Sequence, residues 1–423
     1  MAAPAVPRHA ATLVVARQGD SGVEVLLLQR ADKQDQNSGA WVFPGGLVDA
    51  GDARSHALCN GMDDAAASTR LGVTQGGLDY YIAAIRECFE EAGLLFAVDG
   101  AGRLADAHGQ AIARWDALRQ PLHRGDVALV DACQQTGMRL AVDELHYIGH
   151  WVTPVGLPKR FDTRFFLAVV PPGQSSRHDT IETLDQVWIR PADALAPEHA
   201  RRLLKVTREV LATIGAFADL EALLAWARSE REVPMVMQRR CRDSAGPRSI
   251  MPSEPAWPEI GLLDPEGEVT AWCELRPDIP VRLTPRVQRV TAAGPNGRNA
   301  YVVASASGAC AVIDPSAQDS HVAALLEAAG GRIDWVLQTE PGEGAALLAA
   351  RAGARTLDAG AIDLGPDVRL QVLRSDDADP QTLSYLLVED RMLFGDAGRA
   401  HVDTAGHRIE WIAPAQGFLL PAS

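Results

Sequence analysis

The segment Arg86-Glu87-Cys88-Phe89-Glu90-Glu91-Ala92-Gly93-Leu94 decides how this chain folds and what it does. It completes an apolar pattern over residues 78–93 that predicts a helix with a glycine at its end. On a helix, Glu87, Glu90 and Glu91 stand at i, i+3 and i+4, so three carboxylates crowd one face and repel one another. An isolated acidic run of this kind usually marks a solvated face, but carboxylates are also the ligands that Mg²⁺ and Mn²⁺ prefer.

Two neighbouring features favour the metal site. Arg86 can orient one carboxylate through a bidentate hydrogen bond, and the spacing R-E-x-x-E-E-x-G should occur by chance in fewer than roughly one chain in a thousand of this length. Upstream, the glycines of Pro44-Gly45-Gly46 let the backbone approach a ligand or metal closely. We therefore predict Glu87, Glu90 and Glu91 as metal ligands.

Apolar runs around this helix predict a sheet. Residues 11–16 and 23–29 flank a turn rich in glycine and aspartate, which is typical of a hairpin. A strand is expected to run from residue 41 into the Pro-Gly-Gly turn, whereas residues 53–77 are polar and poorly periodic. Later strands are expected at 146–154, 164–172 and 184–191, followed by a helix pair at 203–214 and 220–228.

A second domain is expected after a break in this pattern. Residues 243–261 hold four prolines, which is typical of a linker or an extended arm. Beyond them, short buried strands alternate with helical runs at 321–329 and 344–352. We predict an α/β (α+β) protein with a first domain at 8–253, a linker at 254–279 and a second domain at 280–423.

Composition excludes several function classes. The 423 residues are 47% apolar and 22% charged, which is ordinary globular usage. The net charge is −15 and the arginines are scattered, which argues against a nucleic-acid partner. Nowhere do about 18 uninterrupted apolar residues occur, so no membrane span is expected. Six widely spaced cysteines indicate reduced thiols and a cytoplasmic location.

These motifs resemble those of the Nudix hydrolases, whose signature is G-x5-E-x7-R-E-U-x-E-E-x-G-U, with U an aliphatic residue. Gly46 matches the first glycine and residues 86–94 match the final block, with Cys88 in an aliphatic slot. The chain departs from the signature in two ways. Asp52 stands where the first glutamate is expected, and 33 residues separate it from Arg86 where the family usually has seven. A longer loop adds little closure entropy, so this insertion (53–78) does not exclude activity.

The segments Leu26–Arg30, Val42–Gly46 and Trp151–Phe166 extend the resemblance to one branch, the peroxisomal coenzyme A diphosphatases and their bacterial relatives, over residues 12–253. The resemblance implies a Nudix α/β/α sandwich with a mixed sheet. It also implies Mg²⁺- or Mn²⁺-dependent cleavage of the diphosphate linkage of CoA or acyl-CoA, giving 3′,5′-ADP and a 4′-phosphopantetheine product. The expected partner is this small-molecule diphosphate, and a homodimer is compatible with the sequence.

The same resemblance assigns roles to individual residues. Metal held by the three glutamates, with Arg86 beside them at the catalytic centre, would neutralise the diphosphate and lower the pKa of an attacking water. A glutamate of the block or an acid of a later loop, Asp179 or Glu182, would take the proton, and Glu182 is also an expected metal ligand. The expected substrate-binding residues are Arg30, Gly45, Gly46, Lys159, Arg160 and Arg164, of which the last three are also compatible with plain surface cations. Trp151 and Trp188 are expected in the core rather than stacked on a base.

The C-terminal part resembles the metallo-β-lactamase fold. Residues 299–303, 311–315, 335–339 and 383–396 follow its strand sequence. Its T-H-x-H-x-D-H metal cluster corresponds here to Thr339–Gly344, which contains no histidine, and Asp396 alone matches a ligand position. One carboxylate cannot assemble a dinuclear zinc centre. We expect a metal-free αββα domain that covers the hydrolase site, dimerises or binds an effector.

Three alternatives stay open. The substrate is ADP-ribose, a dinucleotide or a nucleotide sugar in the first. In the second, the chain is a non-catalytic nucleotide-binding protein, which the Asp52 departure and the insertion keep open. In the third, the second domain is an active zinc hydrolase, which predicts stoichiometric zinc.

Overall fold

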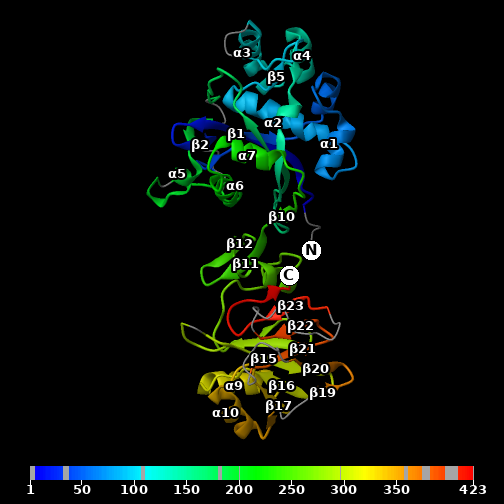
Figure 1. The fold of residues 1–423 in the computed structure, drawn as a ribbon, viewed down its shortest axis with the longest axis vertical. Coiled ribbons are helices and arrows are strands. Elements are labelled where there is room, and N and C mark those ends of the chain that lie inside the picture. The colour runs from blue at the N-terminus through cyan, green and yellow to red at the C-terminus, as the bar shows by residue number, and fades with distance from the viewer. Residues whose placement is uncertain are drawn as a thin grey trace. The chain divides into compact units, whose positions relative to one another are not determined.

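The chain divides into two compact units, Met1–Met237 and Gln238–Ser423. The computed structural model describes residues 5–31, 38–105, 110–179, 183–199, 201–295, 297–356, 361–373, 382–395 and 408–422 (Figure 1). The division after Met237 lies 16 residues before the domain boundary drawn from the sequence at residue 253.

An eight-stranded mixed sheet forms the centre of the first unit, with strand order β10-β7-β8-β1-β2-β3, while β4 pairs with β1 and β9 pairs with β2. β1 runs antiparallel to β2 across the Gly19–Gly22 turn and parallel to β8. The strands are β1 (Arg8–Gly19), β2 (Gly22–Arg30), β3 (Trp41–Val42), β4 (Gly45–Leu47), β7 (His146–Val152), β8 (Phe161–Val169), β9 (Thr183–Ile189) and β10 (Met235–Met237). The predicted hairpin is β1–β2.

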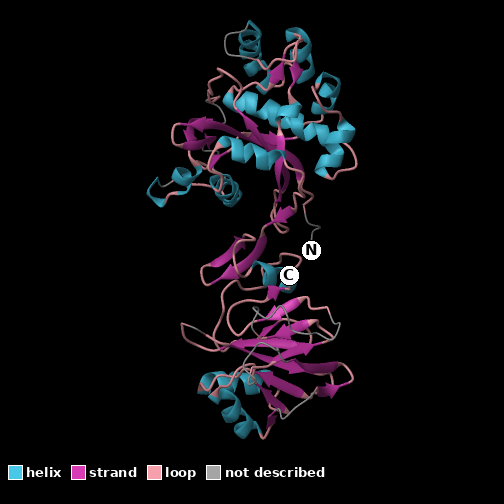
Figure 2. Ribbon diagram, viewed as in Figure 1, coloured by secondary structure: helices cyan, strands magenta, loops and turns pink. Residues whose placement is uncertain are grey.

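Helices pack on both faces of this sheet, because successive side chains of β1 and β2 point to opposite sides (Figure 2). The side chains on one face of the sheet pack against α2 (Gly77–Ala92), and they include Leu13, Val15, Leu26 and Leu28. The side chains on the opposite face pack against α6 (Lys205–Gly215) and α7 (Leu220–Arg228), and they include Val14, Ala16, Val25 and Leu27. The fold is therefore the α/β/α arrangement that the sequence predicts.

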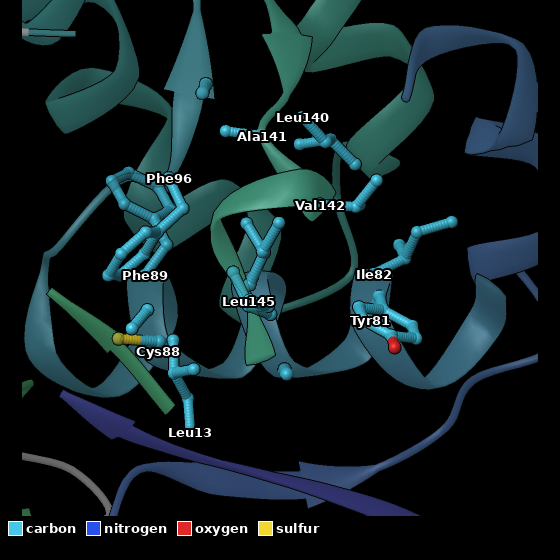
Figure 3. Packing of buried hydrophobic residues seen from close by; sticks show 14 of the residues in the cluster. Leu13, Tyr81, Ile82, Cys88, Phe89, Phe96, Leu140, Ala141, Val142 and Leu145 are labelled. Atoms are coloured by element: carbon cyan, nitrogen blue, oxygen red, sulfur yellow. The ribbon is translucent and has the colours of Figure 1, made fainter. Parts of the chain in front are cut away.

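The core on the α2 side is shown in Figure 3, where Cys88 and Leu13 lie where the helix faces the sheet and Phe89 lies beside Phe96. Cys88 is fully buried, and burial raises the pKa of its thiol. Its place in the aliphatic slot of the motif is thus that of a small apolar side chain.

The insertion at 53–78 is folded rather than irregular. It forms η1 (Asp52–Leu58) and α1 (Asp64–Leu71). Asp63 caps α1 by accepting the Ala66 amide N–H at 2.8 Å, and Asp64 accepts those of Gly76 and Leu78 at 3.0 Å. These caps order a segment whose weak apolar periodicity gave no helix signal.

Further small elements complete the first unit: β5 (Ala97–Val98), α3 (Gln110–His123), α4 (Leu129–Thr136), β6 (Arg139–Leu140), η2 (Val142–Glu144), α5 (Pro191–Leu195) and η3 (Pro197–His199). Among the described residues no single helix is long and apolar enough to span a membrane. Only α6 and α7 taken together meet that length and composition, and they are bent by 109° relative to each other.

The second unit contains two six-stranded mixed sheets that pack face to face. Helices α9 (Asp319–Ala328) and α10 (Glu343–Ala352) cover the outer face of the first sheet. Its strands are β13 (Val281–Arg282), β14 (Val287–Thr291), β15 (Asn299–Ala304), β16 (Cys310–Ile313), β17 (Trp335–Leu337) and β18 (Arg355–Thr356). The other sheet holds β19 (Ile362–Gly365), β20 (Val368–Leu373), β21 (Ser384–Leu387), β22 (Met392–Phe394), β23 (Trp411–Ala413) and β24 (Leu420–Pro421).

The stretch expected to be a linker is part of this second unit. A hairpin of β11 (Arg239–Asp243) and β12 (Gly246–Ile250) is followed by α8 (Trp257–Leu263), which begins with a proline in its first turn, where proline is tolerated. Glu259 of α8 is fully buried and binds Arg289 of β14 at 2.5 and 3.0 Å. The prolines therefore mark the start of a short packed helix.

Candidate functional site

The Pro44-Gly45-Gly46 turn lies where strands β1 and β2 separate from each other. β1 pairs with β2 from Ala16 to Gly19, but nearer its start β1 pairs with β4 at Thr12 and Gly45. At the same end of the sheet β2 pairs with β3 instead. The Leu13 amide donates to the Pro44 carbonyl at 2.9 Å, which fixes the connection between β3 and β4. Gly45 and Gly46 are thereby held on the sheet surface.

Two of the three glutamates of α2, Glu87 and Glu91, lie against this turn. A carboxylate oxygen of Glu91 accepts the Gly45 amide N–H at 2.9 Å. A Cβ atom added to Gly46 would lie within 2.5 Å of both carboxylate oxygens of Glu87, so only glycine leaves room for that side chain. Glu90 and Glu91 are each 7% exposed. The acidic face of the helix is thus not solvated.

Arg86 connects the glutamates to the start of the insertion. Its Nε and Nη2 donate to the two carboxylate oxygens of Asp52 at 2.9 and 3.1 Å, and Nη2 also donates to the Leu47 carbonyl at 2.8 Å. Its Nη1 donates to Glu87 at 2.7 Å and lies 3.8 Å from Glu90. Burial opposes the charge, but these carboxylates outweigh it and raise the pKa of Arg86. Arg86 is therefore a fixed positive charge among the acids.

The departures from the family signature leave this contact intact. Asp52 is 2% exposed and accepts the Asp49 amide at 2.8 Å as η1 begins, which aims its carboxylate at Arg86. The 33 intervening residues return to the site because α1 packs on α2, where a Cβ on Gly77 would collide with the Ser68 backbone. Aspartate thus reaches the arginine across the insertion.

Two residues of α3 support Glu90, and the sequence analysis missed both. Arg119 donates from Nε to the Glu90 carbonyl at 3.0 Å, and His123 Nδ1 lies 3.7 Å from a Glu90 carboxylate oxygen. The two share one helix face at i and i+4. That spacing was the available signal, but it does not indicate which distant carboxylate the pair approaches.

The structure places Arg160 and Lys159 apart from the glutamates, in the connection between β7 and β8. Arg160 is 9% exposed, and it donates to the carbonyls of Thr153 and Ala5 at 2.9 Å each. Lys159 is exposed. Arg160 therefore holds the backbone at the start of β8, and its expected contact with substrate phosphates stays a prediction.

Arg164 lies in the same row of the sheet as Gly46, since both residues pair with Ala11. It is 4% exposed, forms an ion pair with Asp162 and stacks over the Tyr80 ring at 5.3 Å. Its charge is thus already compensated. Arg30 ends β2 at the side of the sheet where the strands fork, and its backbone pairs with Ala40.

The acids proposed for the later loop are only partly described. Asp179 is 5% exposed and accepts the amide and hydroxyl of Thr183 at 2.9 and 2.8 Å, which ties it to the start of β9. Glu182 lies outside the described residues. Trp151 and Trp188 are half-buried and pack against the two cores, and the Trp188 indole donates to the Ser176 hydroxyl at 3.1 Å.

The donor chemistry of the site suits a hard divalent cation, because Glu87, Glu90 and Glu91 offer only carboxylate oxygens. Within the described ranges, no three histidine, cysteine or acidic side chains converge in a geometry that would hold a metal ion. Glu87 is turned to Arg86 and Glu91 to the Gly45 amide.

In the second unit, the Thr339–Gly344 segment, which takes the place of the metallo-β-lactamase metal cluster, begins with a buried polar contact. Asp314 is 8% exposed and accepts the amide and hydroxyl of Thr339 at 2.6 and 2.7 Å. Burial raises the pKa of Asp314. Glu340 lies 3.7 Å from Arg298, and Asp396 lies outside the described residues.

A Nudix domain is thus defined by the sandwich, the glycine turn and the glutamate helix, and the comparison with known families agrees. Residues 73–204 match the sequence family described as the NUDT19 Nudix domain. The first unit therefore carries a NUDT19-type Nudix domain over residues 73–204.

Several known proteins are similar to this chain. The acyl-coenzyme A diphosphatase NUDT19 of Gallus gallus is 28% identical over 221 residues, which cover 42% of this chain and 56% of that protein. The Homo sapiens protein of the same name is 28% identical over 210 residues, covering 41% and 55%. The chain therefore spans about half the length of the curated relatives it matches.

Two solved structures are also similar. A NUDIX hydrolase from Alicyclobacillus acidocaldarius is 29% identical, with a TM-score of 0.44, and covers 52% of this chain and 96% of its own. The BLEG-1 B3 metallo-beta-lactamase is 13% identical, with a TM-score of 0.27, and covers 32% of this chain and 94% of its own.

Proposed function

We propose that this chain is a Mg²⁺- or Mn²⁺-dependent hydrolase that cleaves the diphosphate linkage of CoA, acyl-CoA or a related nucleoside-diphosphate-linked compound. One observation carries the proposal: Glu87, Glu90 and Glu91 gather around Arg86 on one face of α2, where Glu90 and Glu91 are buried and Glu87 and Glu91 lie against the Gly45–Gly46 turn. The names of the relatives favour CoA derivatives over ADP-ribose, dinucleotides and nucleotide sugars.

The chain's own groups would share the work as follows. Glu87, Glu90 and Glu91 would hold the divalent ions, which when bound neutralise the diphosphate and acidify a water. Arg86 stays on Asp52 through two hydrogen bonds and keeps the helix aligned with β4. The Gly45 amide orients Glu91. Because Asp179 is engaged by Thr183, the proton acceptor is assigned to the glutamate block or to Glu182.

Charge-neutral variants of two glutamates test this proposal. Glu90→Gln and Glu91→Gln remove one metal ligand each and should lower turnover at least about 100-fold, since metal-ion catalysis supplies several kcal/mol. Glu221→Gln, at an exposed position of α7, is the matched control and should leave turnover unchanged. The assay follows release of products from CoA, acyl-CoA and ADP-ribose with Mn²⁺, with and without EDTA.

Each result has a definite meaning. Unchanged turnover in both glutamate variants would remove the motif from the mechanism and favour a non-catalytic nucleotide-binding protein. Strong ADP-ribose turnover beside none on CoA would replace the CoA assignment with the nearest alternative. Turnover that survives EDTA would contradict the metal requirement.

For the second unit we propose a metallo-β-lactamase-like αββα domain without a dinuclear zinc centre. The support is the absence of histidine from Thr339–Gly344 together with the helix layer and the two packed sheets of the described residues. Elemental analysis of the purified chain should find no stoichiometric zinc. A zinc to protein ratio near two would contradict this and favour an active zinc hydrolase. A cytoplasmic location and a homodimer stay predictions.

A further inference from the structure

A cavity of about 630 Å³ lies at an edge of the sheet in the first unit. It is bounded by α1, by the start of β7 and by the segment that follows α7, and its lining includes Ala66, Arg70, His146, Tyr147, Arg231 and Val233. β10 pairs with β7 only from His150 to Val152, so it leaves the first residues of β7 uncovered. None of the lining residues belongs to the glutamate site.

The lining of the cavity has more positive than negative charges, two arginines against one glutamate, although the whole chain carries −15. Arg70 and Arg231 line it, and neither forms an ion pair with a carboxylate in the part of the chain that the structure describes. Arg231 is held in place by a hydrogen bond to the Tyr147 carbonyl at 3.3 Å and by stacking on Trp226 at 4.2 Å. Glu230 contributes the single negative charge of the lining.

His146, which also lines the cavity, is affected by these positive charges. Its Nε2 lies 3.3 Å from the Nε donor of Arg228, so the ring accepts that hydrogen bond. Burial and the charges of Arg228 and Arg70 lower the pKa of His146 to about 4. The ring is therefore neutral at pH 7, and the unbalanced charges at this edge of the sheet are those of the arginines.

The cavity also has an apolar wall, which is formed by Ala65, Ala66, Ala227 and Val233. Two arginines beside an apolar wall are complementary to a molecule with an anionic head and a short apolar body.

We infer that this cavity binds a small amphipathic anion, with its head group between Arg70 and Arg231 and its apolar part against Ala66, Ala227 and Val233. The box insertion creates this site, because Arg70 is on α1. α1 is bonded to the first turn of α2: Ser68 Oγ accepts the Gly77 amide at 2.9 Å, and Asp64 accepts the Leu78 amide at 3.0 Å. A ligand on Arg70 therefore contacts the element that directly precedes the glutamate helix.

Calorimetric titration of the full chain tests the inference with four probes at low salt: hexyl phosphate, hexanoate, inorganic phosphate and hexanol. One of the two amphipathic anions should bind more tightly than phosphate or hexanol, and the comparison between them identifies the head group. Arg70→Gln and Arg231→Gln should each weaken that binding about tenfold, the value of one charge-assisted hydrogen bond. Arg103→Gln is the matched control, because its side chain is 80% exposed and pairs only within its own loop.

Several results would overturn the inference. These are no detectable binding of either amphipathic anion to the unaltered chain, equal affinity in all three arginine variants, and loss of binding in Glu90→Gln rather than in Arg70→Gln. The last result would place the anion at the glutamate site. Arg70 is exposed, so its replacement leaves the core intact, and equal circular dichroism spectra verify folding of each variant. The titration needs no turnover, so it stands apart from the proposed hydrolase activity.

Discussion

Alanine substitutions at Gly45 and Gly46 separate stability from activity. In Gly46→Ala the new Cβ lies within 2.5 Å of the Glu87 carboxylate oxygens, so that carboxylate must retreat by about 1 Å to reach ordinary contact distance. Glu87 can do so by rotating its flexible side chain, at a cost within about 1 kcal/mol. A misplacement of about 1 Å at a reacting centre costs roughly 100-fold in turnover. We therefore expect a large loss of kcat with little loss of stability.

Gly45→Ala should show the opposite balance. Its Cβ would meet backbone atoms, the Ala11 carbonyl oxygen at 2.5 Å and Thr12 Cα at 2.8 Å, which cannot rotate away. Overpacking of this kind costs about 1–3 kcal/mol, or about 2–12 °C in Tm for a domain of this size. Gly100→Ala is the matched control, because nothing lies within 4 Å of its added Cβ.

The measurements are kcat on the substrate that the panel identifies, Mn²⁺ affinity by titration, and Tm of each variant. The titration reports on Glu87 without requiring turnover. Wild-type kcat and Mn²⁺ affinity in Gly46→Ala would refute the placement of Glu87 against β4. A fall in Tm in Gly46→Ala as large as that in Gly45→Ala would show that the helix and the turn are packed rigidly, contrary to the reasoning.

Two further predictions concern buried charge. Glu259→Gln leaves Arg289 charged and without its partner in the core of the second unit, so the free energy of unfolding should fall by about 3–5 kcal/mol in urea titrations. Arg332→Gln, which breaks an exposed pair, should change it by under about 1 kcal/mol; equal effects would contradict the buried ion pair. The pKa of His146 is lowered from 6.5 to about 4, so the folded state binds fewer protons than the unfolded chain between these values, and this contribution to stability is lost as pH falls through that window. His146→Gln should flatten the stability profile from pH 6.5 to pH 4; an identical profile would refute the assignment.

The sequence identifies the acidic half of the site well because its residues are close together in the chain. Glu87, Glu90 and Glu91 share a face through helix geometry alone, so a correct helix prediction places them together. The cations behave differently. Arg160 donates hydrogen bonds to the Thr153 and Ala5 carbonyls. No local sequence pattern indicates that Ala5, 155 residues away, will be a partner of Arg160.

The missed elements share a physical reason: their order comes from capping and tertiary contacts rather than from apolar periodicity. Helix α1 has a weak apolar face but is held by Asp63 and Asp64. Helix α8 lies in a proline-rich stretch, yet Glu259 anchors it to Arg289. In both segments the helix is held in place by a buried or capping carboxylate rather than by a row of leucine side chains. The apolar run at 11–16 needed no such help and was predicted correctly as a strand.

The insertion shows how a catalytic motif tolerates interruption. The signature places an acid and Arg86 a few residues apart, but the physical requirement is only that the two side chains meet. Here Arg86 and Asp52 meet through a bidentate pair of hydrogen bonds at 2.9 and 3.1 Å. Loop closure costs little more for 33 residues than for seven, because the cost grows with the logarithm of length. The added chain recovers that cost by packing α1 on α2, and in doing so it brings Arg70 to the cavity beside β7. Deleting residues 63–72 removes α1 but leaves η1, which begins at Asp52, so this variant should preserve the Asp52–Arg86 contact. Whether that variant retains turnover while losing amphipathic-anion binding is a direct test of whether the two sites are independent.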